Sequence, residues 1–144
     1  MPTTSRIADI LLRAKLVDQL QMRSALAHQE QWGGRLAHIV VEKRFTREAD
    51  VVDAISKALN LPKFELANAD KDPAALARLD AEFCKANGVF PAALKDAGKT
   101  LWLVMADPTD ISIVDQVQLK TRARIRTLVA GEGEIAAAIE KHYF

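Results

Sequence analysis

Two arginines stand at equivalent places in two similar stretches of the sequence, twenty-nine residues apart: Arg6 and Arg35. Each is followed by an apolar residue and an alanine, which are Ile7-Ala8 in the first stretch and Leu36-Ala37 in the second. Gln29 lies 23 residues after Arg6, and the five residues EQWGG separate it from Arg35. The two stretches form a tandem repeat, which serves either as a packing unit or as a ligand site used twice.

The tripeptide Gly98-Lys99-Thr100 is a second candidate for chemistry, because phosphate-binding loops end in Gly-Lys-Ser/Thr. Such a loop needs a further glycine five residues before the second one, where this sequence has Ala93. It also needs a following helix whose N-terminus faces the phosphate, whereas an apolar run typical of a strand follows Thr100. We therefore expect a hairpin turn here and no ATP hydrolysis.

Catalytic and metal-binding patterns are weak elsewhere. His38 and Glu42 stand four residues apart, which could place two ligands on one helix face, but the pattern offers no third ligand. Cys84 lies in an apolar segment without a neighbouring histidine, as an inert core thiol does. The sequence contains no Ser-His-Asp order, paired carboxylates or glycine-rich dinucleotide fingerprint. We expect a protein that is not an enzyme and needs no metal or cofactor.

The bulk composition sets the class of protein. The 144 residues carry 20 Lys and Arg against 19 Asp and Glu, a net charge of +1, and 49% of the residues are apolar. This balance gives no electrostatic footprint for nucleic acid or an anionic membrane. A single cysteine, the charged residues within the first fifteen positions and the absence of a long apolar run predict a cytoplasmic protein without direct membrane insertion.

Hydrophobic periodicity predicts an α+β chain in three parts. Residues 1–61 show helical spacing broken at 16–18, 33–34 and 44–46, which predicts a four-helix N-terminal lobe built from two helical hairpins. Residues 62–72 read as an extended linker. Residues 73–144 open with two short helices and continue as a small ββαβα lobe, with strands near 89–91, 101–106 and 124–129 and a last helix over 132–143.

The tandem register and the later sequence LWLVMADPTD, followed by a helix, a strand and a final helix ending in His-Tyr, resemble one known family. It comprises the N-terminal domains of type II secretion and type IV pilus assembly ATPases, and the resemblance covers nearly the whole chain. Some members of that family bind cyclic di-GMP through the tandem motif. The resemblance thus implies a cyclic di-GMP site with these residues: Arg6, Ile7, Ala8, Leu11, Gln29, Arg35, Leu36 and Ala37.

The motif departs from the family in three places. Ala8 and Ala37 stand where the family has glycine. Each repeat of the family also closes with a glutamine, and Gln29 occupies this position in the first repeat, whereas Ala58 occupies it in the second. An alanine methyl hinders close approach, and Ala58 lacks an amide that could bind a base edge. Two interpretations stay open: a non-catalytic adaptor that binds a protein partner of a secretion, pilus or motility apparatus, and a cyclic di-GMP sensor. In the family this region is joined to a motor domain, which we expect this chain to lack.

Overall fold

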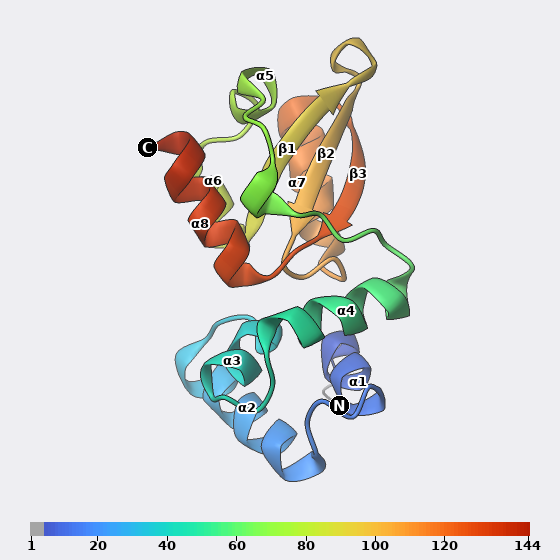
Figure 1. The fold of residues 1–144 in the computed structure, drawn as a ribbon, viewed down its shortest axis with the longest axis vertical. Helices are drawn as coiled ribbons and strands as arrows, with labels where there is room; N and C mark the ends of the chain where they lie inside the picture. The colour runs from blue at the N-terminus through green and yellow to red at the C-terminus, as the bar shows by residue number, and fades with distance from the viewer. Residues whose placement is uncertain (1–4) are drawn as a thin grey trace. The chain divides into compact units, whose positions relative to one another are not determined.

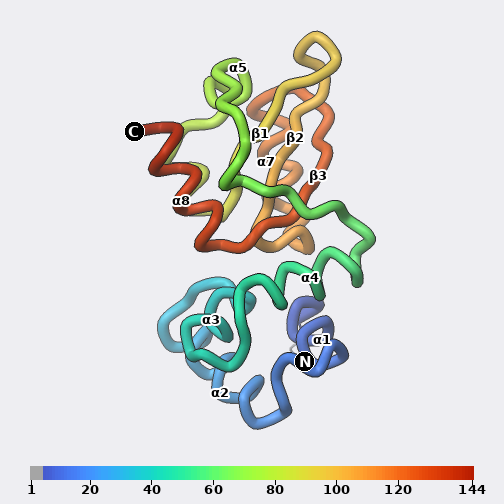
Figure 2. Tube along the Cα trace, in the orientation of Figure 1, coloured from blue at the N-terminus to red at the C-terminus, as the bar shows by residue number. Residues whose placement is uncertain are grey.

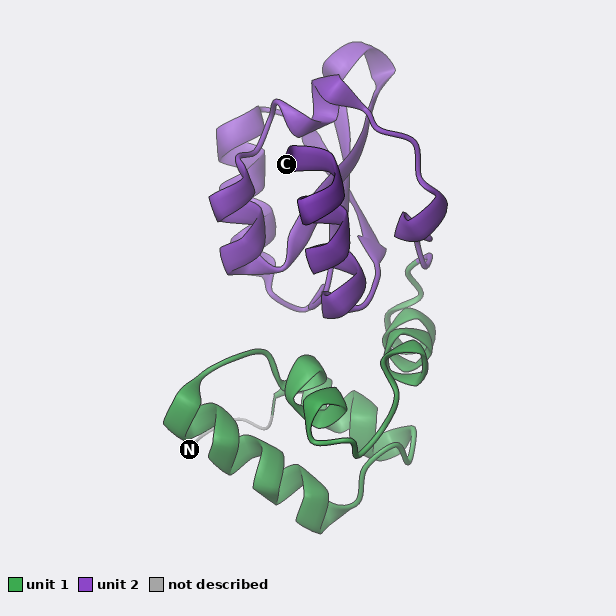
Figure 3. Ribbon diagram, turned by 60° about the vertical axis from the view of Figure 1, so that its left-hand side comes forward, with its two compact units in different colours: residues 1–61 green, residues 62–144 purple. Residues whose placement is uncertain are grey.

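The computed structural model describes residues 5–144, which form two compact units: unit 1 ends at Leu61, and unit 2 runs from Pro62 to Phe144 (Figure 3). Unit 1 is helical, whereas unit 2 combines helices with a three-stranded sheet. The α+β class predicted from the sequence is therefore confirmed. Across the described residues, no helix has the length and apolar character needed to span a membrane.

Unit 1 contains four successive helices (Figures 1 and 2), in which α2 packs most closely on α3 and α1 most closely on α4. Their bounds are α1 Arg6–Arg13, α2 Gln19–Trp32, α3 Leu36–Glu42 and α4 Glu48–Leu59. Side-chain caps explain where the first two begin. The Ser5 hydroxyl accepts a hydrogen bond from the Ala8 amide, and Asp18 and Gln21 form a reciprocal capping box.

The sequence repeat is also a backbone repeat. The Leu16 amide donates to the Leu11 carbonyl at 3.1 Å, and twenty-nine residues later the Phe45 amide donates to the Val40 carbonyl at 3.0 Å. Both bonds close the end of a short helix in the same six-residue ring. Helix periodicity also predicts most of the core, although Leu26 is 36% exposed because α2 turns Met22 and Ala25 inward instead.

The segment 62–72, expected as an extended linker, packs on unit 2. The Phe64 amide donates to the Val129 carbonyl at 2.9 Å, and the Val129 amide donates to the Pro62 carbonyl at 3.0 Å. A short 3₁₀ turn, η1 Leu66–Asn68, then places Leu66 in the core of unit 2. The segment is therefore part of unit 2 and not a free linker. Local composition could not predict this, because the hydrogen bonds join residues that lie far apart in the sequence.

Unit 2 has the ββαβα order predicted for it, preceded by two short helices. The bounds are α5 Pro73–Leu76, α6 Ala81–Asn87, β1 Val89–Lys95, β2 Thr100–Met105, α7 Ile111–Thr121, β3 Arg124–Val129 and α8 Glu132–Tyr143. The sheet order is β1-β2-β3, with β1 antiparallel and β3 parallel to the central β2. A short turn, η2 Asp96–Gly98, closes the β1–β2 hairpin.

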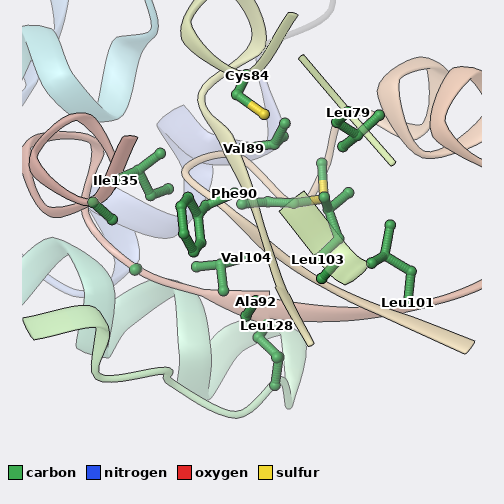
Figure 4. Packing of buried hydrophobic residues seen from close by; sticks show 14 of the residues in the cluster. Leu79, Cys84, Val89, Phe90, Ala92, Leu101, Leu103, Val104, Leu128 and Ile135 are labelled. Carbon is green, nitrogen blue, oxygen red and sulfur yellow. The ribbon is translucent and has the colours of Figure 1, made fainter. Parts of the chain in front are cut away.

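The two sides of β2 are covered unequally. Leu101, Leu103 and Met105 alternate along the strand and are fully buried in the core of unit 2. Figure 4 shows Leu101 and Leu103 among the other core side chains. Thr100 and Trp102 point to the opposite side and are only partly buried. Helix α7 lies behind the sheet in Figure 1. The sheet therefore keeps an open area on the Trp102 side, next to the hairpin turn.

Candidate functional site

A cleft of about 520 Å³ opens on unit 1 between α1 and α4. Arg6, at the start of α1, lines it together with Ala58, near the end of α4. The cleft is thus lined both by Arg6, which begins the first repeat, and by Ala58, which stands at the closing glutamine position of the second repeat. The remaining lining residues are Asp9, Ile10, Arg13, Ala14, Ala54, Lys57 and Leu59.

Helical spacing explains how α1 lines the cleft. Its contributions follow Arg6 at intervals of three, four, seven and eight residues, so they share one face of the helix. Ile7, Ala8 and Leu11 lie on another face, with exposed fractions of 2%, 0% and 0%. This buried face fixes α1 in unit 1 and thereby orients the Arg6 side of the helix toward the cleft.

The cleft is electropositive. Three cationic side chains, Arg6, Arg13 and Lys57, line it, against one carboxylate, that of Asp9. Arg6 is exposed, and its guanidinium forms no hydrogen bond or ion pair with another residue in the described part of the chain. A guanidinium fork of this kind can bind a phosphate or the edge of a guanine through two parallel hydrogen bonds.

The closing position of each repeat lies at the start of the other repeat. Gln29 closes the first repeat, and its Nε2 donates to the Gly34 carbonyl at 3.0 Å, directly before Arg35. Ala58 occupies the equivalent position of the second repeat and lines the cleft with Arg6. A ligand in the cleft would therefore contact both repeats at once.

The structure distributes the eight residues of the implied site over several environments. Only Arg6 lines the cleft. Ile7, Ala8, Leu11 and Leu36 are buried, with Leu36 4% exposed. Gln29, Arg35 and Ala37 are half-buried, and Arg35 stands at the N-cap position of α3. Arg35, the arginine of the second repeat, therefore does not line the cleft.

Sequence reasoning missed most of the α4 side of the cleft. Ala54, Lys57 and Ala58 follow one another at helical spacing, and the charge of Lys57 is the only signal that could have singled out this face. On α1, the i and i+7 pair of Arg6 and Arg13 carries a similar signal. Neither signal shows that α1 and α4 pack together, because that contact depends on the tertiary fold.

Other candidates for chemistry lack a site. Thr100 begins strand β2, so the Gly98-Lys99-Thr100 tripeptide does not precede a helix. His38 Nε2 lies 3.3 Å from Glu42 Oε1, and no group of three or more His, Cys, Asp and Glu that could hold a metal occurs among the described residues. Burial raises the pKa of the Cys84 thiol from 9.0 to about 11, which leaves it a protonated core thiol at neutral pH.

Comparisons with known proteins agree on one family. The family model of the MshEN domain matches residues 59–143. The chain is 30% identical over 140 residues to the type IV pilus assembly ATPase PilB of Myxococcus xanthus, covering 97% of this chain and 24% of that protein. It is 31% identical over 120 residues to PilB of Thermus thermophilus, covering 80% of this chain and 13% of that protein. The chain therefore spans a quarter or less of the length of these relatives.

Solved structures share the fold. The N-terminal domain of XpsE superimposes with a TM-score of 0.81 at 23% identity, covering 100% of both chains. A structure of MshE with cdg superimposes with a TM-score of 0.73 at 22% identity, covering 97% of this chain and 100% of that one. At these identities the likeness shows a common architecture that includes both units.

Proposed function

Because the chain belongs to the MshEN domain family, we propose that it is a non-catalytic, cytoplasmic regulatory domain of a pilus or secretion assembly machinery whose unit 1 binds cyclic di-GMP. Two comparisons support this proposal: the similarity to pilus assembly ATPases, and a shared fold with MshE, whose structure contains cdg, an abbreviation of cyclic di-GMP. The regulatory role also includes docking on a protein partner of that machinery.

The electropositive cleft carries the proposal. Its volume of about 520 Å³ lies within the range of about 300–1,000 Å³ typical of small-molecule sites. Its three cationic side chains complement the two phosphates of cyclic di-GMP, and the exposed Arg6 has a fork that can bind a phosphate or a guanine edge. The apolar side chains of Ile10 and Leu59 provide surface against which a purine can lie.

Ala58 weakens the site. The family pattern places a glutamine at this position, and a glutamine amide can both donate to and accept from a base edge. Alanine leaves that edge unbound, so binding depends more heavily on the charged residues Arg6, Arg13 and Lys57. We therefore expect the wild-type chain to bind cyclic di-GMP weakly and with a strong dependence on salt concentration.

Isothermal titration calorimetry with cyclic di-GMP, with GTP as a control ligand, tests the proposal. Arg6→Ala should weaken binding by about 1.5–3 kcal/mol, as expected for losing charge-assisted hydrogen bonds. Arg23→Ala is the matched control, because Arg23 is exposed on α2 and does not line the cleft. Absence of heat at millimolar ligand, or an equal loss in both variants, would rule out the proposed site.

A further inference from the structure

The open side of the unit 2 sheet gathers positive charge next to the hairpin turn. In the strand register, Lys95 lies opposite Thr100, Thr100 lies opposite Arg124, and Trp102 lies opposite Arg126. Residues paired across neighbouring strands point to the same side of a sheet. Lys95, Trp102, Arg124 and Arg126 therefore share one side, called here the basic sheet face, and line a depression of about 680 Å³.

Trp102 organises the cations of this face. The Nζ of Lys95 lies 4.9 Å from the centroid of the Trp102 ring, and the Cζ of Arg126 lies 5.7 Å from it. The two side chains come from strands on either side of β2. Cation–π attraction of this kind restrains long side chains without neutralising their charge. The face thus presents ordered and still charged groups.

The charge of the basic sheet face is local and unbalanced. Unit 2 as a whole has eleven Lys and Arg against twelve Asp and Glu. The depression, in contrast, is lined by three cations and one carboxylate, that of Asp96, which accepts a hydrogen bond from Thr100 Oγ1 at 2.8 Å. Within the described residues, Lys95, Arg124 and Arg126 form no ion pair, and all three are exposed. Such a cluster is complementary to an acidic partner.

The spacing of the two arginines indicates the form of that partner. Arg124 and Arg126 are two residues apart on β3, so their Cα atoms lie roughly 6.5 Å apart along the strand. An extended peptide with carboxylates at every second residue repeats at the same distance. A nucleobase would need a free aromatic ring for stacking, whereas Lys95 and Arg126 already lie over Trp102. The face therefore fits an acidic peptide better than a nucleic acid.

We propose that the basic sheet face is a docking site for an extended acidic segment of a partner protein. The proposal supplies a partner class for the docking part of the proposed function, on which it rests. It does not depend on cyclic di-GMP, because the residues that carry it belong to unit 2 and the cleft belongs to unit 1. Either site can therefore fail its test while the other passes.

Trp102 itself reports on occupancy of the face. The sequence has two tryptophans, and Trp32 is 71% exposed on α2, so Trp32→Phe leaves Trp102 as the only indole at little structural cost. In this background, an eight-residue peptide of alternating Glu and Ser should change Trp102 emission saturably at low salt. The same peptide with Gln in place of Glu should cause no saturable change. Added salt should weaken the binding of the acidic peptide.

Charge reversal then locates the site. The double variant Arg124→Glu/Arg126→Glu should lower the affinity for the acidic peptide by about tenfold or more. The double variant Lys71→Glu/Lys141→Glu changes the net charge equally at exposed positions that do not line the depression, and it should stay within about twofold of the parent. Circular dichroism would reveal whether the Arg124/Arg126 double variant alters the fold. Lys95→Gln, a milder change, keeps the test valid in that case and should give a smaller loss of affinity for the acidic peptide.

Three results would overturn the proposal. The first is no change in Trp102 emission at millimolar acidic peptide. The second is an equal loss of affinity in the Lys71/Lys141 control, which would show only general charge attraction. The third is tighter binding of an eight-nucleotide oligothymidylate, or of vesicles containing phosphatidylserine, that is lost in the Arg124/Arg126 variant.

Discussion

Lys15 and Arg44 adopt the same left-handed backbone conformation, with φ angles of 60° and 62°, at equivalent positions of the two repeats. Each directly follows the C-cap residue of a short helix, and each amide donates to a carbonyl three residues earlier, Leu12 at 3.0 Å and Val41 at 2.9 Å. Glycine is the usual residue in this conformation because it has no Cβ. The repeat thus preserves a backbone shape that neither side chain favours.

Glycine at either position should stabilise the protein. Relief of left-handed strain gives about 1–2 kcal/mol, part of which the greater freedom of glycine in the unfolded chain offsets. We expect Lys15→Gly and Arg44→Gly each to raise the free energy of unfolding by about 0.5–1 kcal/mol, measured by urea denaturation. Lys43→Gly is the control, since Lys43 has a right-handed φ of −78° and should lose stability instead. Equal effects in all three variants would contradict this explanation.

The buried alanine of the first repeat should not tolerate the family glycine. Ala8 has an exposed fraction of 0% inside α1, so Ala8→Gly removes a packed methyl and adds backbone freedom. We expect a loss of about 1–2 kcal/mol in the free energy of unfolding. The half-buried Ala37 should lose less on the same change, about 0.5–1 kcal/mol. A gain in stability for Ala8→Gly would show that its methyl is under compression.

Restoring the missing amide should improve ligand binding. Ala58 is exposed and lines the cleft, so a longer side chain can be placed there without disturbing the core. We expect Ala58→Gln to tighten cyclic di-GMP binding by about fivefold to tenfold, the size of one added hydrogen bond. Ala58→Leu has a similar volume and no amide, and it serves as the control. Equal tightening by both would indicate apolar contact instead of a hydrogen bond.

The single cysteine should be unreactive in the folded protein. Cys84 is fully buried with its Sγ 3.7 Å from the Tyr143 hydroxyl, and burial raises its pKa to about 11. The thiolate that attacks a disulfide reagent is therefore scarce at pH 8. We expect reaction with dithionitrobenzoate to proceed only as fast as the protein unfolds, and at once in urea. Fast labelling of the native protein would contradict this burial.

The raised thiol pKa also sets the sign of a pH effect. The folded state holds the Cys84 proton up to about pH 11, whereas an unfolded thiol with its ordinary pKa of 9.0 loses it earlier. The folded state thus binds more protons than the unfolded state between pH 9 and pH 11. The contribution of Cys84 to the free energy of unfolding is therefore intact below pH 9 and falls as the pH rises toward 11. Cys84→Ala should make this loss of stability with rising pH shallower. Part of the loss should remain in the variant, because burial also raises the pKa of Tyr143.

Local signals predicted the elements, and non-local packing decided the rest. The caps at Asp18, Asp72 and Asp110 and the periodicity of each helix lie within a few neighbouring residues, which explains why the four helices and the ββαβα order were predictable. The docking of Phe64 on Val129 and the meeting of Arg6 with Ala58 depend on residues far apart in the chain. Leu119 on α7 is 81% exposed, although its apolar side chain favours a buried position.

The most direct test of the central claim is an NMR titration of uniformly ¹⁵N-labelled protein with cyclic di-GMP. Binding in the cleft should shift the amide signals of Arg6, Arg13, Lys57 and Ala58, while the signals of the β1–β2 hairpin stay unchanged. The same titration of Arg6→Ala should need several times more ligand for the same shifts. Shifts confined to unit 2, or no shifts at millimolar ligand, would contradict a cyclic di-GMP site in unit 1.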